Sequence, residues 1–328
     1  MTNNATTGPW SRLWDMGVLH SCANGIQGNY DGSILKFWQR QFDSLEDSSS
    51  VVDIGTGNGA LLLLARESAM ARGIKLHMHG IDIADINPAQ SIPDGKNRFA
   101  GIHFHPNTSA CRLPFTDGEV DMVCSQFGFE YAPREAAIQE MMRVVHARSR
   151  ISLIAHSTDS VIAEVAGPQL EACAFLLHES PIIEQARAMA SILSHAAITK
   201  NTVREASPLE SENERINFNR SAEKLADEIE RLPQAQVLRN AANQIRSALQ
   251  IASKSLPQSE LILKQLIINL EDEQTRLRQL QSALLSDTEL EVLVNRLQQH
   301  GFHTRYAKLE QQPNVKVGWS IEATRGLT

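Results

Sequence analysis

The stretch VVDIGTGNGALLLLARES, residues 51–68, constrains the fold of this 328-residue chain more than any other segment. An apolar run ends at Asp53, three glycines follow at alternate positions, and an apolar, helix-like stretch begins at once. Glycine adopts left-handed backbone conformations that other residues avoid, so the pattern predicts a strand, a tight turn and a helix. Such a turn brings the backbone close to a ligand, and the open question is which ligand.

Strand-like segments alternate with helical segments on both sides of this turn. Because parallel strands need crossover connections, the alternation predicts an α/β fold with a doubly wound, Rossmann-like sheet of seven strands. The last two strands are joined by the turn QQPN, so we expect an antiparallel pair at the end of the sheet. The predicted strands are residues 51–55, 75–83, 98–106, 120–128, 150–157, 302–310 and 315–325.

Between residues 161 and 286 the strand pattern stops, and apolar residues recur three and four positions apart. This spacing predicts an α-helical insertion into the α/β fold. Its last helix, from about 258 to 285, has an apolar stripe that the body of the protein, the insertion itself or a second subunit must cover. A coiled coil is an alternative, although no clean heptad persists. The stripe contains Leu263, Leu266, Ile267, Leu270 and Leu277.

Composition and charge exclude several classes of function. The formal net charge of -7 and the lack of a dense Lys/Arg block argue against a nucleic-acid or anionic-membrane partner. The four cysteines are scattered, which argues against a zinc cluster or a disulfide framework. The chain shows no secretory signal and no apolar run of about 20 residues, so we expect a cytoplasmic protein with no membrane partner.

The glycine turn fits two cofactor classes. The letters GTGNGA match the G-x-G-x-x-A fingerprint of dinucleotide-binding folds, whereas DIGTGNG matches the D-x-G-x-G-x-G motif of class I S-adenosylmethionine-dependent methyltransferases. Asp82 ends the second predicted strand, where a carboxylate accepts hydrogen bonds from two ribose hydroxyls. Both classes have an acid there, so Asp82 does not separate them.

Two further features resemble the methyltransferases. RLPFTDGEVDMVCSQFGFEYAP, residues 112–133, is similar to the LPF-x-D-x-x-F-D-x-V block of many small-molecule methyltransferases. The terminal helix and antiparallel strand pair resemble the reversed seventh strand of that fold. The resemblance covers roughly residues 28–160 and 287–325 and identifies the chain as similar to class I small-molecule methyltransferases, with a large helical insertion.

The resemblance implies S-adenosylmethionine as cofactor and three parts of the chain. Residues 1–50 form a helical segment that covers the cofactor, residues 51–160 and 287–328 form the core, and residues 161–286 form the insertion. The cofactor carries no pyrophosphate, so the glycines let the backbone pass close to it where a Cβ would clash. The expected cofactor-binding residues are Tyr30, Asp53, Gly55, Thr56, Gly57, Asn58, Gly59, Asp82, Ile83, Asn107, Ser109, Ala110, Ser125, Gln126 and Phe127.

The loop after the third strand departs from the family pattern. Where similar enzymes have an aspartate that accepts from the adenine amino group, this chain has Ser109 in TSACRLPF. A hydroxyl still accepts that hydrogen bond, but without the assistance of a negative charge. Asn107 is a second candidate for this contact.

Methyl transfer from a sulfonium needs an aligned methyl acceptor and, where that acceptor is protonated, a base. We therefore expect no metal. Candidates for catalysis are His156, just past the fifth strand, with Tyr131 and Glu130 beyond the fourth. Tyr131, Phe175 and His178 are expected to line the site of the methyl acceptor. The N-terminal segment offers His20 and Tyr30, of which Tyr30 is the predicted cofactor contact.

The sequence thus predicts an enzyme that methylates O, N or C of a small molecule. Alternatives are a protein methyltransferase, a catalytically silent binding or scaffold protein, and a nicotinamide oxidoreductase. The insertion is expected to serve as a lid over the site of the methyl acceptor, as a homodimer contact, or both. The dimer contact would use Leu266, Ile267, Leu270 and Leu277.

Overall fold

The computed structural model describes residues 8–21, 28–199 and 208–325, and its chain divides into two compact units. Unit 1 consists of Met1–Ala163 and Gln279–Thr328, and unit 2 consists of Glu164–Arg278. Unit 1 contains the whole sheet, whereas the described residues of unit 2 are helical. None of the described helices is both long enough and apolar enough to cross a bilayer.

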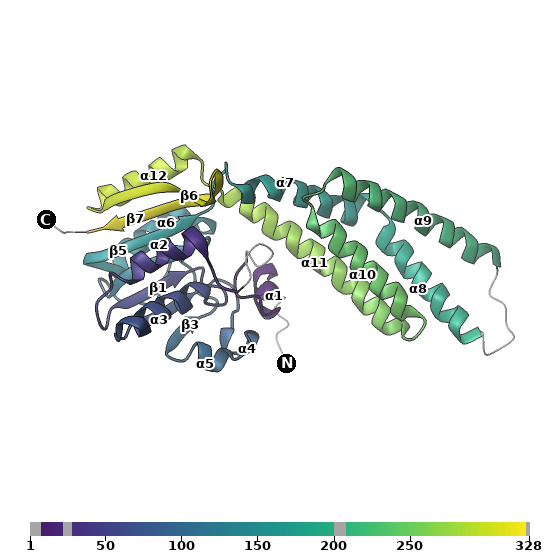
Figure 1. Ribbon diagram of the computed structural model, residues 1–328, viewed down its shortest axis with the longest axis horizontal. Helices are drawn as coiled ribbons and strands as arrows, with labels where there is room; N and C mark the ends of the chain where they lie inside the picture. Colours follow the sequence, from purple (N-terminus) through teal and green to yellow (C-terminus); the bar gives the residue numbers. More distant parts are fainter. Residues whose placement is uncertain (1–7, 22–27, 200–207, 326–328) are drawn as a thin grey trace. The chain divides into compact units, whose positions relative to one another are not determined.

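The sheet of unit 1 has seven strands in the order β3-β2-β1-β4-β5-β7-β6 (Figure 1). β1 to β5 are parallel, and β7 is antiparallel to both β5 and β6. The predicted α/β, Rossmann-like sheet with a reversed final strand is therefore confirmed. The strands are β1 (Ser50–Ile54), β2 (His77–Ile81), β3 (Ile102–His105), β4 (Val120–Gln126), β5 (Val145–Ala155), β6 (His303–Gln312) and β7 (Val315–Thr324).

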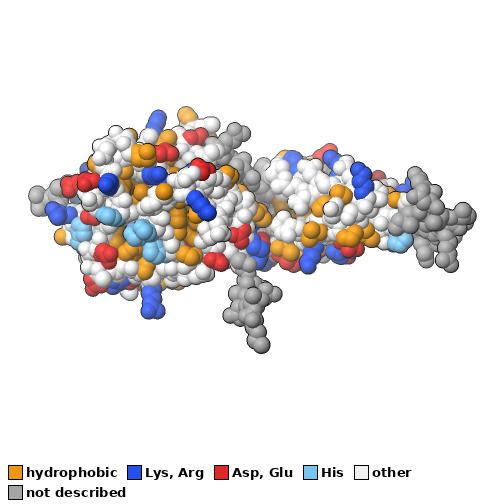
Figure 2. Space-filling model, turned by 90° about the horizontal axis from the view of Figure 1, so that it is seen from below, with side chains coloured by type: hydrophobic (Ala, Val, Ile, Leu, Met, Phe, Trp, Pro, Cys, Tyr) orange, Lys and Arg blue, Asp and Glu red, His pale blue; other side chains and the backbone are white. Residues whose placement is uncertain are grey.

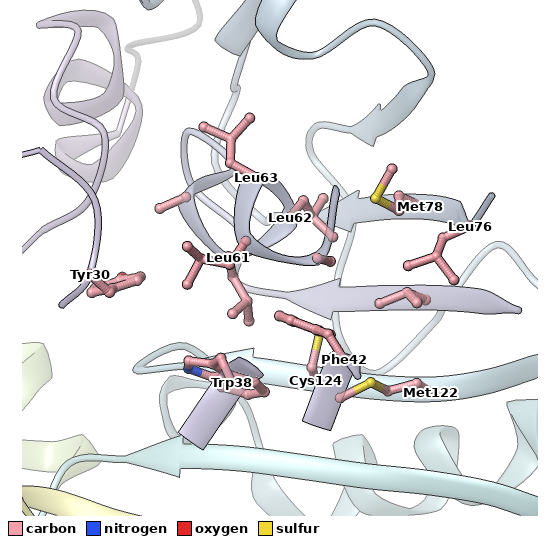
Figure 3. Packing of buried hydrophobic residues seen from close by; sticks show 14 of the residues in the cluster. Tyr30, Trp38, Phe42, Leu61, Leu62, Leu63, Leu76, Met78, Met122 and Cys124 are labelled. Carbon is pink, nitrogen blue, oxygen red and sulfur yellow. The ribbon is translucent and has the colours of Figure 1, made fainter. Parts of the chain in front are cut away.

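Helices of unit 1 cover both faces of the sheet. On one face, α2 (Gly32–Phe42) and α3 (Ala60–Arg72) pack against β1 and β4, and Figure 3 shows Trp38 and Phe42 beside Cys124 and Met122. On the other face, α6 (Arg134–Val144) and α12 (Asp287–Gln299) bury their apolar stripes. The remaining helices of this unit are α1 (Pro9–Asp15), α4 (Pro88–Ser91), α5 (Gly95–Arg98) and the 3-10 turn η1 (Phe129–Tyr131).

The chain enters and leaves the helical region at neighbouring points of unit 1. Ser157 forms a parallel bridge with Leu285, and the Leu285 N–H donates to the His156 carbonyl oxygen at 3.0 Å. The helices in between are α7 (Val161–Ala174), the π-helix η2 (Phe175–Glu179), α8 (Ile182–Thr199), α9 (Pro208–Arg231), α10 (Gln236–Ala252) and α11 (Leu256–Ala283).

The apolar stripe of α11 is already buried in the single chain. Leu266 and Leu270 are 2% exposed, and Leu277 is 8% exposed. The prediction that these side chains form a homodimer contact is therefore wrong, because they are not available to a second subunit without unpacking the helix. Ile267 is half-buried. The role of the insertion as a lid stays a prediction.

Four histidines share one face of β2 and β3 at the edge of the sheet, and Figure 2 shows histidine side chains gathered on the surface of unit 1. His79 stacks on His103 and on His105, each at 5.3 Å between ring centroids. Its Nδ1 lies 3.1 Å from His105 Nε2. Among the described residues, no group of three or more His, Cys, Asp or Glu side chains is arranged to hold a metal ion. The fourth histidine of this face is His77.

Two of these histidines, His79 and His105, have pKa values below the ordinary value for histidine. Burial, together with the neighbouring His105 and His103, lowers the pKa of His79 to about 4, while Glu119 opposes the shift. Burial and His103 also lower the pKa of His105. The unfolded chain takes up these protons below pH 6.5, so the stability that neutrality provides is lost as the pH falls from 6.5 towards 4.

We expect the free energy of unfolding to fall by about 1 kcal/mol more in the wild type than in a His79→Phe variant between pH 7 and pH 4.5. Phenylalanine keeps the ring packing but cannot titrate. Urea unfolding at both pH values measures the difference. Identical pH dependence in the two proteins would show that the stack does not oppose protonation.

Candidate functional site

A pocket of about 260 Å³ lies at the carboxyl ends of β1, β2 and β4 in unit 1. Ligands of doubly wound folds bind there, where neighbouring strands connect to helices on opposite faces. Residues of the N-terminal segment, the glycine turn, and the loops after β2, β3 and β4 line it. The sequence-predicted residues among its lining are Tyr30, Asp53, Gly55, Thr56, Asp82, Ile83, Ser109, Ala110, Gln126, Phe127 and Tyr131.

The turns after β1 and β4 pack closely against each other where they line the pocket. Gly55 has φ 71°, and a Cβ on it would lie 2.7 Å from Gly128 Cα. A Cβ on Gly128 would in turn lie 2.7 Å from the Ile54 carbonyl oxygen. Only glycine fits either position, because real Cβ atoms do not approach backbone so closely. Both glycines line the pocket.

Protein side chains fill the space beside Gly57 and Gly59, and their predicted contact with a cofactor stays a prediction. A Cβ on Gly57 would meet the Trp14 ring at 2.6 Å, and one on Gly59 would meet the Phe104 ring at 2.8 Å. Neither glycine lines the pocket. These two positions therefore need glycine for close packing of aromatic rings, and because φ is positive at both.

Two buried carboxylates face the pocket. Asp82, at the end of β2, accepts from the Gly57 N–H and from the Ala84 N–H, both at 2.8 Å. Asp53 is 1% exposed, and its Oδ1 has no hydrogen-bond partner among the described residues. Burial raises the pKa of Asp53 to about 8, the nearby Thr56 side chain opposes the rise, and Asp82 adds to it. Burial raises the pKa of Asp82 as well, against the two N–H groups.

No Lys or Arg side chain lines this pocket in the described part of the chain. Two carboxylates without a facing cation make a site that favours a positively charged ligand. A cation bound at Asp53 would stabilise its ionised form and offset the desolvation that now raises its pKa.

The N-terminal segment, residues 8–21, is fixed over the glycine turn by Asn58. This side chain is completely buried, and its Nδ2 donates to the carbonyl oxygens of Trp14 at 2.9 Å and Val18 at 2.7 Å. Trp14 stacks on Trp10, and Trp10 meets Tyr131 edge-on at 5.5 Å. Asn58 does not line the pocket and holds the N-terminal segment in place, and its predicted contact with a cofactor stays a prediction.

Beyond β4 the chain makes a strained turn into the pocket. Phe127 has φ 55°, which is unfavourable for an aromatic residue, and its N–H donates to the Ile154 carbonyl oxygen at 2.8 Å. The Trp38 Nε1–H donates to Gln126 Oε1 at 2.6 Å, which leaves Gln126 Nε2 at the pocket without a partner among the described residues. Ser125 is fully buried and donates to the Ile54 carbonyl oxygen, so it supports this turn from outside the pocket.

The loop after β3 reaches the pocket through Thr108, Ser109 and Ala110. Thr108 N–H donates to the Asp82 carbonyl oxygen at 2.8 Å, which ties this loop to the end of β2. Ser109 Oγ accepts from the Cys111 N–H at 3.2 Å and has a hydroxyl proton and a second lone pair left. Asn107 is exposed outside the pocket, and its Nδ2 lies 3.4 Å from Asp85 Oδ1.

Of the three predicted catalytic residues, only Tyr131 lines the pocket. His156 is 5% exposed and stacks on the far side of Phe127 at 4.2 Å, and burial lowers its pKa to about 3. Glu130 accepts from the His156 N–H at 2.7 Å, and burial raises its pKa to about 7. Catalytic roles for His156 and Glu130 stay predictions. Neither side chain lines the pocket.

Phe175 and His178, the other predicted contacts with a substrate, belong to η2 in unit 2, and that assignment stays a prediction. The sequence analysis missed Trp10, Trp14 and Leu61 as pocket residues and did not select His20. The spacing of Trp10 and Trp14, four residues apart after Pro9, was the available signal for an aromatic helix face.

The unpaired polar atoms of the pocket fit S-adenosylmethionine. Among the buried polar atoms without a partner in the described residues, acceptors on the strand-end side belong to Asp53 and Thr56, and donors belong to Trp14 and Gln126. The ligand carries an ammonium group and hydroxyls that need acceptors, and a carboxylate that needs donors. Its sulfonium and ammonium also supply the positive charge that the two carboxylates favour.

Comparison with known families gives one match. Residues 51–148 match the family model described as a methyltransferase domain. These residues run from β1 into β5 and include the glycine turn, Asp82 and the loops after β3 and β4. No curated protein matches the chain.

Several solved structures are similar to parts of the chain at low identity. A methyltransferase from Aquifex aeolicus is 19% identical over 40% of this chain and 76% of its own, with a TM-score of 0.31. A possible histamine N-methyltransferase from Thermotoga maritima is 11% identical over 89% of both chains, with a TM-score of 0.37. A geranyl diphosphate methyltransferase is 15% identical over 38% of this chain and 45% of its own, with a TM-score of 0.32.

The chain spans about half the length of some structures that it matches, 45% of the geranyl diphosphate enzyme and 54% of a chain solved with the Haloferax volcanii Trm112 activator.

The Asn58 contacts predict how firmly the N-terminal segment is held. In an Asn58→Ala variant we expect the free energy of unfolding to fall by about 1–3 kcal/mol, because the carbonyl groups of Trp14 and Val18 lose their donor. Hydrogen exchange should then accelerate in residues 9–21 more than elsewhere in unit 1. Asn295→Ala, at an exposed position of α12, is the matched control. Equal exchange of this segment in all three proteins would contradict the role of Asn58.

Proposed function

We propose that the chain, which carries a class I S-adenosylmethionine-dependent methyltransferase domain, transfers a methyl group to a small-molecule acceptor that is uncharged or cationic. S-adenosylmethionine is the cofactor of this domain. When bound, it supplies an activated methyl group on a positively charged sulfur. The residues of the pocket bind it, align the methyl acceptor and exclude water.

The observation that carries this proposal is that the pocket contains two carboxyl groups and no cationic Lys or Arg side chain among the described residues. The two carboxyl groups are those of Asp53 and Asp82. A phosphate or carboxylate beside the reacting atom would be held without a counter-charge in a partly desolvated site, which is costly. Uncharged and cationic groups avoid this cost.

Three strand ends would hold the cofactor. Asp82 already accepts two backbone N–H bonds and has lone pairs left for the ribose hydroxyls. Asp53 would accept from the ammonium group, which accounts for its unpaired Oδ1. Ser109 and Ala110 would contact the adenine ring, and the hydrogen bond from Thr108 to Asp82, which ties their loop to the end of β2, supports this assignment.

The aromatic side of the pocket would hold the methyl acceptor. Trp10 and Tyr131 meet edge-on at 5.5 Å, and Phe127 projects beside them from the strained turn after β4. Such rings bind flat apolar groups and also attract cations through their faces. Gln126 Nε2 supplies an unpaired donor to the same pocket. This combination supports a small apolar or amine-bearing molecule.

The experiment uses a protein-free metabolite extract incubated with methyl-labelled S-adenosylmethionine and the full chain. Mass spectrometry should find a labelled small molecule without phosphate or carboxylate next to the methylated atom. Transfer to proteins of an unfractionated lysate, but not to the extract, would favour a protein substrate. Binding of S-adenosylhomocysteine without any transfer would favour a scaffold role. A labelled anionic product would contradict the charge argument.

Cofactor affinity should depend on Asp82. Asp82→Asn keeps an oxygen for the Gly57 or Ala84 N–H but loses the charge, so hydrogen bonds to ribose weaken. We expect a loss of roughly 1.5 kcal/mol or more, which is about tenfold in affinity for S-adenosylhomocysteine by titration calorimetry. Asp85→Asn, three residues along and exposed, is the control. Unchanged affinity in a folded Asp82→Asn protein would exclude this carboxylate from the cofactor site.

A further inference from the structure

His20 occupies a part of the pocket that the proposed function does not yet use. Its side chain is 2% exposed and lines the pocket from the N-terminal segment. The imidazole stacks on Tyr30 at 4.6 Å with an angle of 22° between the rings, so its orientation is fixed. Tyr30 belongs to the buried hydrophobic cluster shown in Figure 3, which also contains Leu61.

The hydrogen bonding of His20 determines its tautomer. Nε2 lies 3.1 Å from the Gly28 carbonyl oxygen, and a carbonyl oxygen only accepts, so Nε2 must carry a proton. In the neutral ring, Nδ1 then has a free lone pair. This atom is buried and has no hydrogen-bond partner within the described ranges. The fold therefore holds a basic nitrogen at the pocket with its acceptor function unsatisfied.

The hydrogen-bond donors of the cofactor have proposed acceptors other than His20 Nδ1. In the proposed function the ribose hydroxyls would donate to Asp82, the ammonium group to Asp53 and the adenine amino group to Ser109, all of which line the pocket from β1, β2 and the loop after β3. His20 comes from the segment that covers the sheet. The remaining donor that enters such a pocket is an O–H or N–H group of the methyl acceptor.

We propose that Nδ1 of His20 is the general base for the methyl acceptor, which is consequently an O–H or N–H compound; this rests on the proposed function. Nδ1 takes the proton from the acceptor atom as that atom attacks the methyl carbon. A bond from the acceptor atom to carbon forms, the carbon–sulfur bond breaks, and its electron pair stays on sulfur. S-adenosylhomocysteine and the methylated product leave, and the imidazolium returns its proton to water.

The ring is suited to this task at neutral pH. Burial lowers the pKa of His20, and the bond to Gly28 and the charge of Asp31 oppose the shift only in part. Asp31 is the charged side chain that acts on it among the described residues. Since a base must be unprotonated, transfer should be constant above pH 6.5 and fall with acid below it.

The test compares wild type with His20→Gln on the labelled product found in the metabolite extract. Glutamine can donate to the Gly28 carbonyl oxygen but has no basic nitrogen. We expect transfer to fall by about 100-fold or more, with the affinity for S-adenosylhomocysteine unchanged and the acid limb of the pH profile absent. His303→Gln, at an exposed position on β6, should behave as wild type.

Chemical rescue separates a base from a structural residue. Free imidazole should restore part of the transfer in a His20→Ala protein, because it can occupy the vacated space and take the proton. Full activity of His20→Gln, loss of cofactor affinity in that variant, absence of rescue, or a product methylated on an atom that carries no proton would each overturn the inference. If the wild type itself transfers no methyl group, it is the proposed function that fails.

Discussion

The carboxylate of Asp82 is the group on which the site depends. It lies at the end of β2 and accepts from Gly57 in the turn after β1 and from Ala84 in its own loop, both at 2.8 Å. Its backbone carbonyl oxygen accepts from Thr108 in the loop after β3. One residue thus joins three loops that line the pocket, and its side chain is 7% exposed. The glycine turn can be held in this way because Gly57 adopts φ 52°.

The second constraint is the N-terminal segment, residues 8–21, whose aromatic side chains cover this turn. Trp14 fills the space that a Cβ would occupy at Gly57, and Asn58 holds the backbone of Trp14 and Val18. Residues 8–21 therefore complete the pocket and bring His20 to it. Polar atoms without partners remain on both sides, on Asp53 from the sheet and on His20 and Trp14 from the cover. Such atoms are costly to bury, and a ligand that pairs them would stabilise the closed arrangement.

The sequence predicted the sheet and the strand ends well because both follow from local patterns. Asp53, Asp82 and Gln126 stand where apolar strands end, and parallel strands place such ends at one edge of the sheet. Contacts between residues far apart in the sequence could not be predicted from local patterns. Gly57 packs against Trp14, and Ser125 bonds to Ile54 of the neighbouring strand. The apolar stripe of α11 predicts that one face of this helix is buried, but its periodicity does not show which surface covers that face.

Hydrogen exchange with and without S-adenosylhomocysteine tests the central claim most directly, because it needs no knowledge of the methyl acceptor. The account predicts slower exchange in the glycine turn, in the loops after β2 and β3, and in residues 8–21, since the ligand would pair atoms from both the sheet and its cover. Protection elsewhere in the chain, or no change in these segments at saturating ligand, would contradict it.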